Sequence, residues 1–115
     1  MRLLSSDEVN FVLKKKRSWI LRACSCSGVT PAAIVAYGSA SRIELREDSD
    51  LDIAIIFEDE DTVRRGREAV WGAEREDLWP LDLLFYSENE FHHRANGGGV
   101  CMIIREEGRV LYGSL

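Results

Sequence analysis

Two aspartates at the beginning of an apolar segment have a type and spacing that suit metal-dependent chemistry. Asp50 and Asp52 stand two positions apart at the start of the run Leu51–Phe57, which reads LDIAIIF. Side chains two positions apart on a strand point to the same face, so we expect both carboxylates to project together. Carboxylates held this close repel, and each raises the pKa of the other unless a cation lies between them. Mg²⁺ suits this demand, because in proteins it binds carboxylates together with substrate phosphates.

A third aspartate occupies a similar setting further along the chain. Asp82 is the only charged residue in the apolar run PLDLLFY, residues 80–86. If this run forms a strand beside Leu51–Phe57, Asp82 can face Asp50 and Asp52. Three carboxylates can hold two metal ions about 4 Å apart, which stabilises the attacking and the leaving oxygen in phosphoryl transfer. For each aspartate, the alternative is a solvated position at a turn or a strand edge.

A glycine-serine pair supplies groups that bind phosphate. Gly38 and Ser39 directly follow the apolar run Ala32–Tyr37. Glycine after a strand lets backbone amides approach an anion, and a helix starting near Ser39 would point free N–H groups at the same anion. The Ser39 hydroxyl and the fork of donors on Arg42 are expected to reach phosphate oxygens as well. An ordinary turn at the end of a strand is the alternative interpretation.

Helices are expected where apolar residues recur at helical spacing. A capping-box pair, Ser5 and Glu8, marks the start of a helix that runs to about Cys24, with Lys14–Arg17 as a mostly solvated face. The polar stretch Ala40–Asp48 is compatible with a short helix. Three further helices are predicted over Glu60–Asp77, from Ser87 to about Asn96, and over Val100–Glu107, where a helix is favoured over a strand.

Short apolar runs between these helices predict the strands of a sheet. They cover Ala32–Tyr37, Leu51–Phe57, Leu81–Tyr86 and Arg109–Tyr112. The run Leu51–Phe57 is apolar on both faces, which is typical of an interior strand covered on both sides. The alternation of strands and helices predicts an α/β or α+β fold, with a small mixed β-sheet and helices packed on it.

The combined spacing resembles the nucleotidyltransferase superfamily that includes DNA polymerase beta. The pattern is GS, ten residues, DLD, and then a lone aspartate in the next strand. The short length and the ending EEGRVLYG, residues 106–113, are similar to the minimal nucleotidyltransferase branch, antitoxin type. By position, the resemblance implies three metal-binding carboxylates, which are Asp50, Asp52 and Asp82. Asp82 would also help to deprotonate the acceptor. The phosphate-binding residues that it implies are Gly38, Ser39 and Arg42. The branch often has Gly after this arginine, where this chain has Ile43.

The resemblance implies an activity and a partner. The reaction would transfer a nucleoside monophosphate to a hydroxyl with the help of two Mg²⁺ ions. The expected nucleotide is AMP, with ATP as its donor. A chain of 115 residues leaves little room for an acceptor site. The resemblance therefore implies a partner protein, commonly a helical HEPN-type toxin whose tyrosine is adenylylated, with this chain as the antitoxin. Two alternatives are an antitoxin that acts by binding alone, and a homodimeric enzyme that modifies small molecules such as aminoglycosides.

Composition limits the classes of partner and location. The net charge of −5 argues against nonspecific nucleic-acid binding, which relies on clustered Lys and Arg. The longest apolar run is too short to span a bilayer, and the start MRLLSSDEVNF lacks the apolar core of a secretory signal. Three cysteines, Cys24, Cys26 and Cys101, suggest no disulfide framework, so a reducing cytoplasm is expected. The length predicts a single nucleotidyltransferase domain over 1–115.

Overall fold

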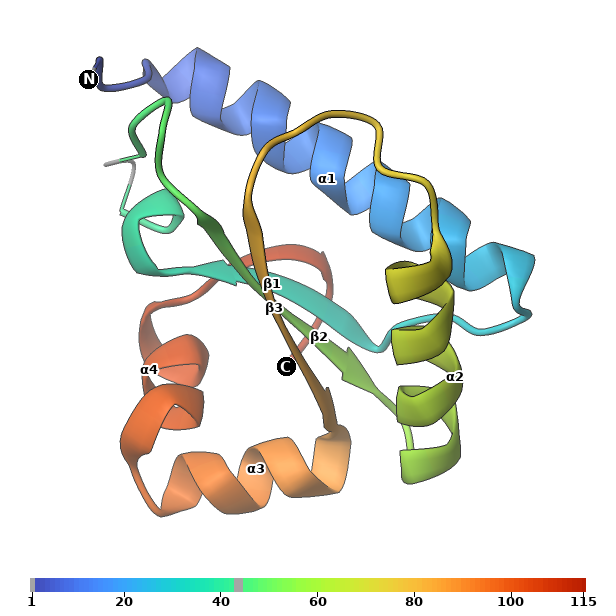
Figure 1. The fold of residues 1–115 in the computed structure, drawn as a ribbon. Helices are drawn as coiled ribbons and strands as arrows, with labels where there is room; N and C mark the ends of the chain where they lie inside the picture. The colour runs from blue at the N-terminus through green and yellow to red at the C-terminus, as the bar shows by residue number, and fades with distance from the viewer. Residues whose placement is uncertain (1, 43–44) are drawn as a thin grey trace.

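A computed structural model describes residues 2–42 and 45–115 of the chain and, within them, builds one mixed sheet (Figure 1). Its four strands are β1 (Ala33–Tyr37), β2 (Leu51–Phe57), β3 (Leu81–Ser87) and β4 (Arg109–Gly113). They are ordered β3-β2-β1-β4, with β1 antiparallel to both β2 and β4. Strand β3 runs parallel to β2. The small mixed sheet predicted from the sequence is confirmed.

Helices cover both faces of this sheet in the described part of the chain. On one face lie α1 (Ser6–Cys26) and α2 (Glu60–Gly72), and on the other α3 (Glu88–Asn96) and α4 (Gly99–Glu107) (Figure 1). The crossover between the parallel strands β2 and β3 passes through α2. The helical and strand elements together confirm the α+β fold. Within the residues described, no helix has both the length and the apolar character needed to cross a membrane.

Strand β2 shows why its sequence is apolar on both faces. Ile53, Ile55 and Phe57 belong to the core cluster under α1 and α2, whereas Ala54 and Ile56 belong to the cluster under α3 and α4. The strand lies between β1 and β3, so the prediction of an interior strand is confirmed. Because side chains alternate along a strand, Asp52 lies on the same face as Ala54 and Ile56.

The face of α1 that we expected to be solvated is partly buried. The predicted capping box at Ser5 and Glu8 is present, but Lys16 within the stretch Lys14–Arg17 is only 1 % exposed. This part of the prediction is wrong, because Lys16 lies three residues after Leu13 and four before Ile20, on the buried side of the helix. Its ammonium donates to Asp77 Oδ1 at 2.6 Å and to Glu76 Oε1 at 3.4 Å, which keeps the buried charge paired.

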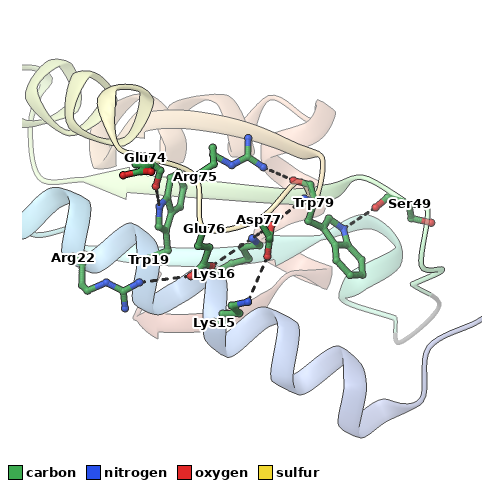
Figure 2. A network of polar contacts seen from close by, with 10 residues as sticks. All are labelled: Lys15, Lys16, Trp19, Arg22, Ser49, Glu74, Arg75, Glu76, Asp77 and Trp79. Atoms are coloured by element: carbon green, nitrogen blue, oxygen red, sulfur yellow. Dashed lines mark hydrogen bonds and ion pairs between the residues drawn. The ribbon is translucent and has the colours of Figure 1, made fainter.

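The same contacts explain why α2 is shorter than predicted. The helix ends at Gly72 rather than at Asp77, and residues 73–80 run beside α1 instead (Figure 2). The indole Nε1 of Trp19 donates to the carbonyl of Glu74 at 2.9 Å, and Lys16 binds the carboxylate of Asp77. These tertiary contacts need an extended segment, and they outweigh the helical preference of the charged sequence.

In the polar stretch Ala40–Asp48, the described residues 41–42 and 45–48 do not lie in the short helix that we expected there. A one-turn 3₁₀ helix, η1 (Gly38–Ala40), precedes it. Further on, Arg46 forms an isolated antiparallel bridge with Leu3, and the N–H of Leu4 donates to the carbonyl of Leu45 at 2.9 Å. Leu45 is fully buried, so this segment is held extended against the start of the chain. Ile43 lies outside the described residues. The other predicted helices, including the one over Val100–Glu107, are confirmed with small shifts of their ends.

Gly66→Ala is expected to lower the free energy of unfolding by about 2 kcal/mol, because α2 crosses β2 closely at this position. A Cβ at Gly66 would lie 2.2 Å from Cζ of Phe57, which is itself fully buried. Urea unfolding measures the change. Gly72→Ala at the end of the same helix is the control, since no described atom outside its local backbone lies within 4 Å of the new Cβ. The free energy of unfolding of Gly72→Ala should equal that of wild type or rise by up to about 1 kcal/mol. Equal losses of this free energy in Gly66→Ala and Gly72→Ala would contradict the close packing of Gly66 on Phe57.

Asp77→Asn is expected to lower the free energy of unfolding by about 2 kcal/mol at neutral pH, because the neutral amide leaves the buried ammonium of Lys16 with only the longer of these two ion pairs, the one with Glu76. This figure is set below that of a fully buried pair, since the Asp77 side chain is 32 % exposed. Burial raises the pKa of Asp77, but the hydrogen bonds from Lys16 and the N–H of Trp79, with the charges of Lys16 and Lys15, together lower it below 3.8.

The sign of this shift determines the pH profile. A carboxyl whose folded pKa is lowered contributes stability above its ordinary pKa of 3.8, and loses it as the pH falls through the lowered folded value. The stability difference between wild type and Asp77→Asn should therefore shrink as the pH falls below about 3.8. Urea unfolding over a pH series measures this difference. Glu68→Gln, which removes an exposed contact with Arg64, should change stability by about 0.5 kcal/mol or less. A difference between wild type and Asp77→Asn that is independent of pH would contradict the assignment.

Candidate active site

Parallel pairing of β2 and β3 brings two of the predicted carboxylates together. Asp52 and Asp82 are direct register partners, one pair in from the start of each strand. The N–H of Leu51 donates to the carbonyl of Pro80 at 3.0 Å, which aligns the two strands at this end. Neighbouring strands lie about 5 Å apart, so side chains of register partners on one face are in reach of each other. The expectation that the third strand lies beside the second is confirmed.

The carboxylate of Asp52 is perturbed by its surroundings. Asp52 is half-buried and Asp82 is exposed. Burial raises the pKa of Asp52 above its ordinary 3.8, and the charge of Asp82, a hydrogen bond with Asp82 and the charge of Asp50 raise it further. The ionised pair is therefore unfavourable without a cation. The chemistry of these donors fits a divalent metal ion, because hard cations prefer carboxylate oxygens.

Gly38 forms the wall of the site beside Asp52. Its φ is +68°, a backbone conformation that glycine adopts readily and other residues adopt at a cost. A Cβ built on Gly38 would lie 2.6 Å from Oδ2 of Asp52. Both the conformation and the close approach of the carboxylate therefore require glycine at this position. This contact ties the glycine of the motif to the aspartate that follows fourteen positions later.

The turn after Gly38 is tight and internally bonded. The N–H of Ser41 and its hydroxyl both donate to the carbonyl of Gly38, at 3.2 and 2.8 Å. The N–H of Arg42 donates to the carbonyl of Ser39 at 3.2 Å. Ser39 is half-buried and Arg42 is exposed. The helix that we expected near Ser39 is thus a single 3₁₀ turn, η1, and the phosphate contacts of Ser39 and Arg42 stay predictions.

Asp50 occupies a different position from the other two aspartates. It lies before β2 and is exposed, whereas Asp52 is within the strand. Its charge contributes to the raised pKa of Asp52, which places it in the electrostatic environment of the pair. Among the residues described, no three Asp, Glu, His or Cys side chains are already gathered in a metal-binding arrangement. The structure thus brings Asp52 and Asp82 together and leaves Asp50 exposed, just before the start of β2.

Tyr37 belongs to this site and is absent from the sequence-based prediction. It is the register partner of Asp52 across the β1–β2 pair, so Tyr37, Asp52 and Asp82 form a row across three strands. Burial raises the pKa of Tyr37 above its ordinary value of 10, and the charges of Asp52 and Asp82 raise it further. The phenol therefore stays protonated and can donate a hydrogen bond. Only the register of the strands reveals this role, since nothing in the local sequence distinguishes the tyrosine.

Comparison with protein families agrees with this geometry. Residues 17–111 match the family model of the nucleotidyltransferase domain. The match covers well over half of the chain, so the protein belongs to this family. No curated protein and no solved structure matches the chain. The matched range contains Gly38, Asp52 and Asp82, and the resemblance to the polymerase-beta-like superfamily is confirmed at this level.

Family membership defines the general chemistry. The chain is a transferase of the nucleotidyl type, and its substrate is a nucleoside triphosphate. Nucleotidyltransferase domains generally act with a divalent metal ion. Within the matched range, the structure brings the carboxylates of Asp52 and Asp82 together beside Gly38, and carboxylate oxygens are the donors that such metal ions prefer.

Proposed function

We propose that the aspartates at the start of β2 and β3 hold the metal ions of a nucleotidyl-transfer site. Asp52 and Asp82 would be the principal ligands, and Asp50 would complete the set from its exposed position before β2. The observation that carries this proposal is the register pairing of Asp52 with Asp82 against Gly38. The backbone at Gly38, the hydroxyl of Ser39 and the guanidinium of Arg42 would bind the triphosphate.

The chemistry follows from these positions. Two Mg²⁺ ions, when bound, would neutralise the charge of the phosphates and of the attacking and leaving oxygens. The acceptor hydroxyl attacks the α-phosphorus, a new P–O bond forms, and the bond to pyrophosphate breaks. Asp82 is exposed, so its carboxylate is accessible to take up the proton of the acceptor hydroxyl. Tyr37 stays neutral and offers a donor beside Asp52.

The acceptor is proposed to be a protein. We infer that the chain belongs to the minimal nucleotidyltransferase branch and adenylylates a tyrosine of a helical HEPN-type toxin, with ATP as the donor and with an antitoxin role. The exposed position of Asp82 at the edge strand β3 supports a macromolecular acceptor, because a large substrate can approach it from outside. The motif spacing and the ending EEGRVLYG support the branch.

The organisation proposed for the protein is simple. One nucleotidyltransferase domain over 1–115 carries all of the proposed site residues. The three cysteines are free thiols, which supports a reducing compartment such as the cytoplasm. Without the toxin partner, the acceptor site would have to be completed by another chain. A second copy of this chain is the candidate.

Intact mass of the partner tests the proposal. The chain is co-expressed with the protein encoded beside it, and the purified pair is incubated with ATP and Mg²⁺. The account predicts a gain of one or more AMP units on the partner, which is absent with Asp52→Asn. An unmodified partner that still co-purifies would contradict the catalytic role and favour an antitoxin that acts by binding. Absence of both a complex and a mass change would contradict the protein acceptor.

A further inference from the structure

A tryptophan outside the carboxylate site joins the two segments that carry its metal ligands. We propose that Trp79 is a positioning residue: its indole fixes the turn before Asp50 to the connection that leads into Asp82. This inference rests on the proposed function, because it assigns Trp79 a role in placing the proposed metal ligands. Trp79 comes three residues before Asp82 in the sequence.

The backbone on both sides of Asp50 is bonded to the segment before β3. The indole Nε1 of Trp79 donates to the carbonyl of Ser49 at 2.9 Å (Figure 2). The N–H of Leu51 donates to the carbonyl of Pro80 at 3.0 Å. Asp50 lies between these two contacts, so its backbone is held from the same side as Asp82. The indole contact is the only one of the two made by a side chain, and it can therefore be removed by substitution.

The turn that ends at Ser49 is attached at its beginning to the start of the chain. Arg46 bridges Leu3, and the N–H of Glu47 donates to the carbonyl of Arg2 at 3.1 Å. At Ser49 itself, the N–H donates to the carbonyl of Arg46 at 3.0 Å and the hydroxyl accepts from the N–H of Arg46 at 3.3 Å, so both contacts stay within the turn. The contact with Trp79 crosses 30 positions of sequence and attaches this end of the turn, next to Asp50, to the segment before β3.

Trp79 is itself held in place by an ion pair whose lysine is buried and whose aspartate is partly exposed. Its N–H donates to Oδ1 of Asp77 at 2.9 Å, and the same oxygen accepts from the buried ammonium of Lys16 at 2.6 Å. Arg75 donates to the carbonyl of Trp79. Figure 2 shows this chain of contacts running from α1 through residues 74–79 to Ser49. These contacts thus connect the turn before Asp50 to α1, a long and well-packed helix.

The physical consequence concerns the affinity for metal. A ligand on a loose turn loses conformational freedom when it binds, and that loss opposes binding. A turn that is already fixed avoids this cost. Removing a contact that orients a metal ligand typically weakens metal binding 10- to 100-fold. Because Asp50 is exposed and lies before β2 rather than within it, we expect an effect at the lower end, about 10-fold.

The test measures Mn²⁺ binding by electron paramagnetic resonance, without nucleotide or acceptor. Trp79→Phe keeps an aromatic ring but removes the N–H donor, and Mn²⁺ should bind about 10-fold more weakly than to wild type. Trp71→Phe is the matched control, because Trp71 is 58 % exposed on α2 and contacts the ring of Phe85 instead. Its Mn²⁺ affinity should equal that of wild type.

A second variant separates the hydrogen bond from packing. Benzothienylalanine at position 79 keeps the bicyclic ring and exchanges only the indole N–H for sulfur. It should weaken Mn²⁺ binding as much as Trp79→Phe does, with a melting temperature close to that of wild type. Unchanged Mn²⁺ affinity in both variants, with binding lost in Asp52→Asn, would overturn the role of Trp79 and leave the proposed function intact. Wild type and Asp52→Asn binding Mn²⁺ equally would instead overturn the proposed function itself.

Discussion

Asp52→Asn is expected to reduce nucleotidyl transfer by about 1,000-fold or more while the fold is retained. The side chain lies beside Asp82 and against the backbone of Gly38, at the centre of the proposed site. The amide has nearly the same shape but lacks the charge that a divalent cation needs. Folding should not suffer, because the substitution relieves the repulsion and burial that raise the pKa of Asp52. The rate is measured as pyrophosphate release from ATP and Mg²⁺ in the presence of the partner.

The control for this prediction is Asp48→Asn. Asp48 is an exposed aspartate four positions before Asp52, and its substitution changes the net charge by the same amount. It should leave the rate within about twofold of wild type. The melting temperature of metal-free Asp52→Asn should be equal to or higher than that of wild type. An Asp52→Asn enzyme with the wild-type rate would rule out a metal-ligand role for this carboxylate.

Gly38→Ala is expected to lower both stability and activity. The alanine must adopt a φ of +68°, which costs roughly 1–2 kcal/mol. Its Cβ would also lie 2.6 Å from Oδ2 of Asp52, and relief of this overlap costs about 1 kcal/mol or more. The total loss in the free energy of unfolding should be about 2–3 kcal/mol. The displaced carboxylate of Asp52 should lower the transfer rate strongly as well, which the pyrophosphate assay measures.

Gly98→Ala separates the cost of the backbone conformation from the cost of the overlap with Asp52. Gly98 has a φ of +95°, and no described atom outside its neighbours lies within 4 Å of a Cβ built there. With a ψ of −162° as well, Gly98 lies in a backbone region that is nearly exclusive to glycine, so this variant should carry only a backbone cost of roughly 1–3 kcal/mol, with the wild-type transfer rate. If Gly38→Ala and Gly98→Ala lost the same stability and kept the same rate, the contact between Gly38 and Asp52 would have no functional importance.

Much of the fold was predictable because its strands and helices have clear local patterns. The run Leu51–Phe57 is apolar on both faces and is the interior strand β2, as predicted. Ser5 and Glu8 form the predicted capping box of α1. Within the site, Gly38 and Asp52 lie in contact because β1 and β2 are adjacent antiparallel strands joined by the motif segment itself. Local sequence therefore contains most of the information on this half of the site.

The remaining features depend on contacts between distant parts of the chain. The stretch Lys14–Arg17 was expected to be a mostly solvated face, and Lys14 and Lys15 are exposed, but the spacing of Lys16 from Leu13 and Ile20 places it on the apolar face of α1. Its partner Asp77 is 61 positions away in the sequence, so only the folded chain shows why the charge is tolerated. The same holds for Trp79 and Ser49, which are 30 positions apart. These contacts also determine the end of α2, which local propensity extends too far.

A crystal structure of the protein with Mg²⁺ and the non-hydrolysable analogue α,β-methylene-ATP would show which carboxylates hold the metal ions. We expect metal density within about 2.1 Å of carboxylate oxygens of both Asp52 and Asp82, with the triphosphate lying against Gly38 and Ser39. We also expect the α-phosphorus to face the exposed side of Asp82. A nucleotide bound elsewhere, or metal ions that contact neither Asp52 nor Asp82, would contradict the assignment of this site.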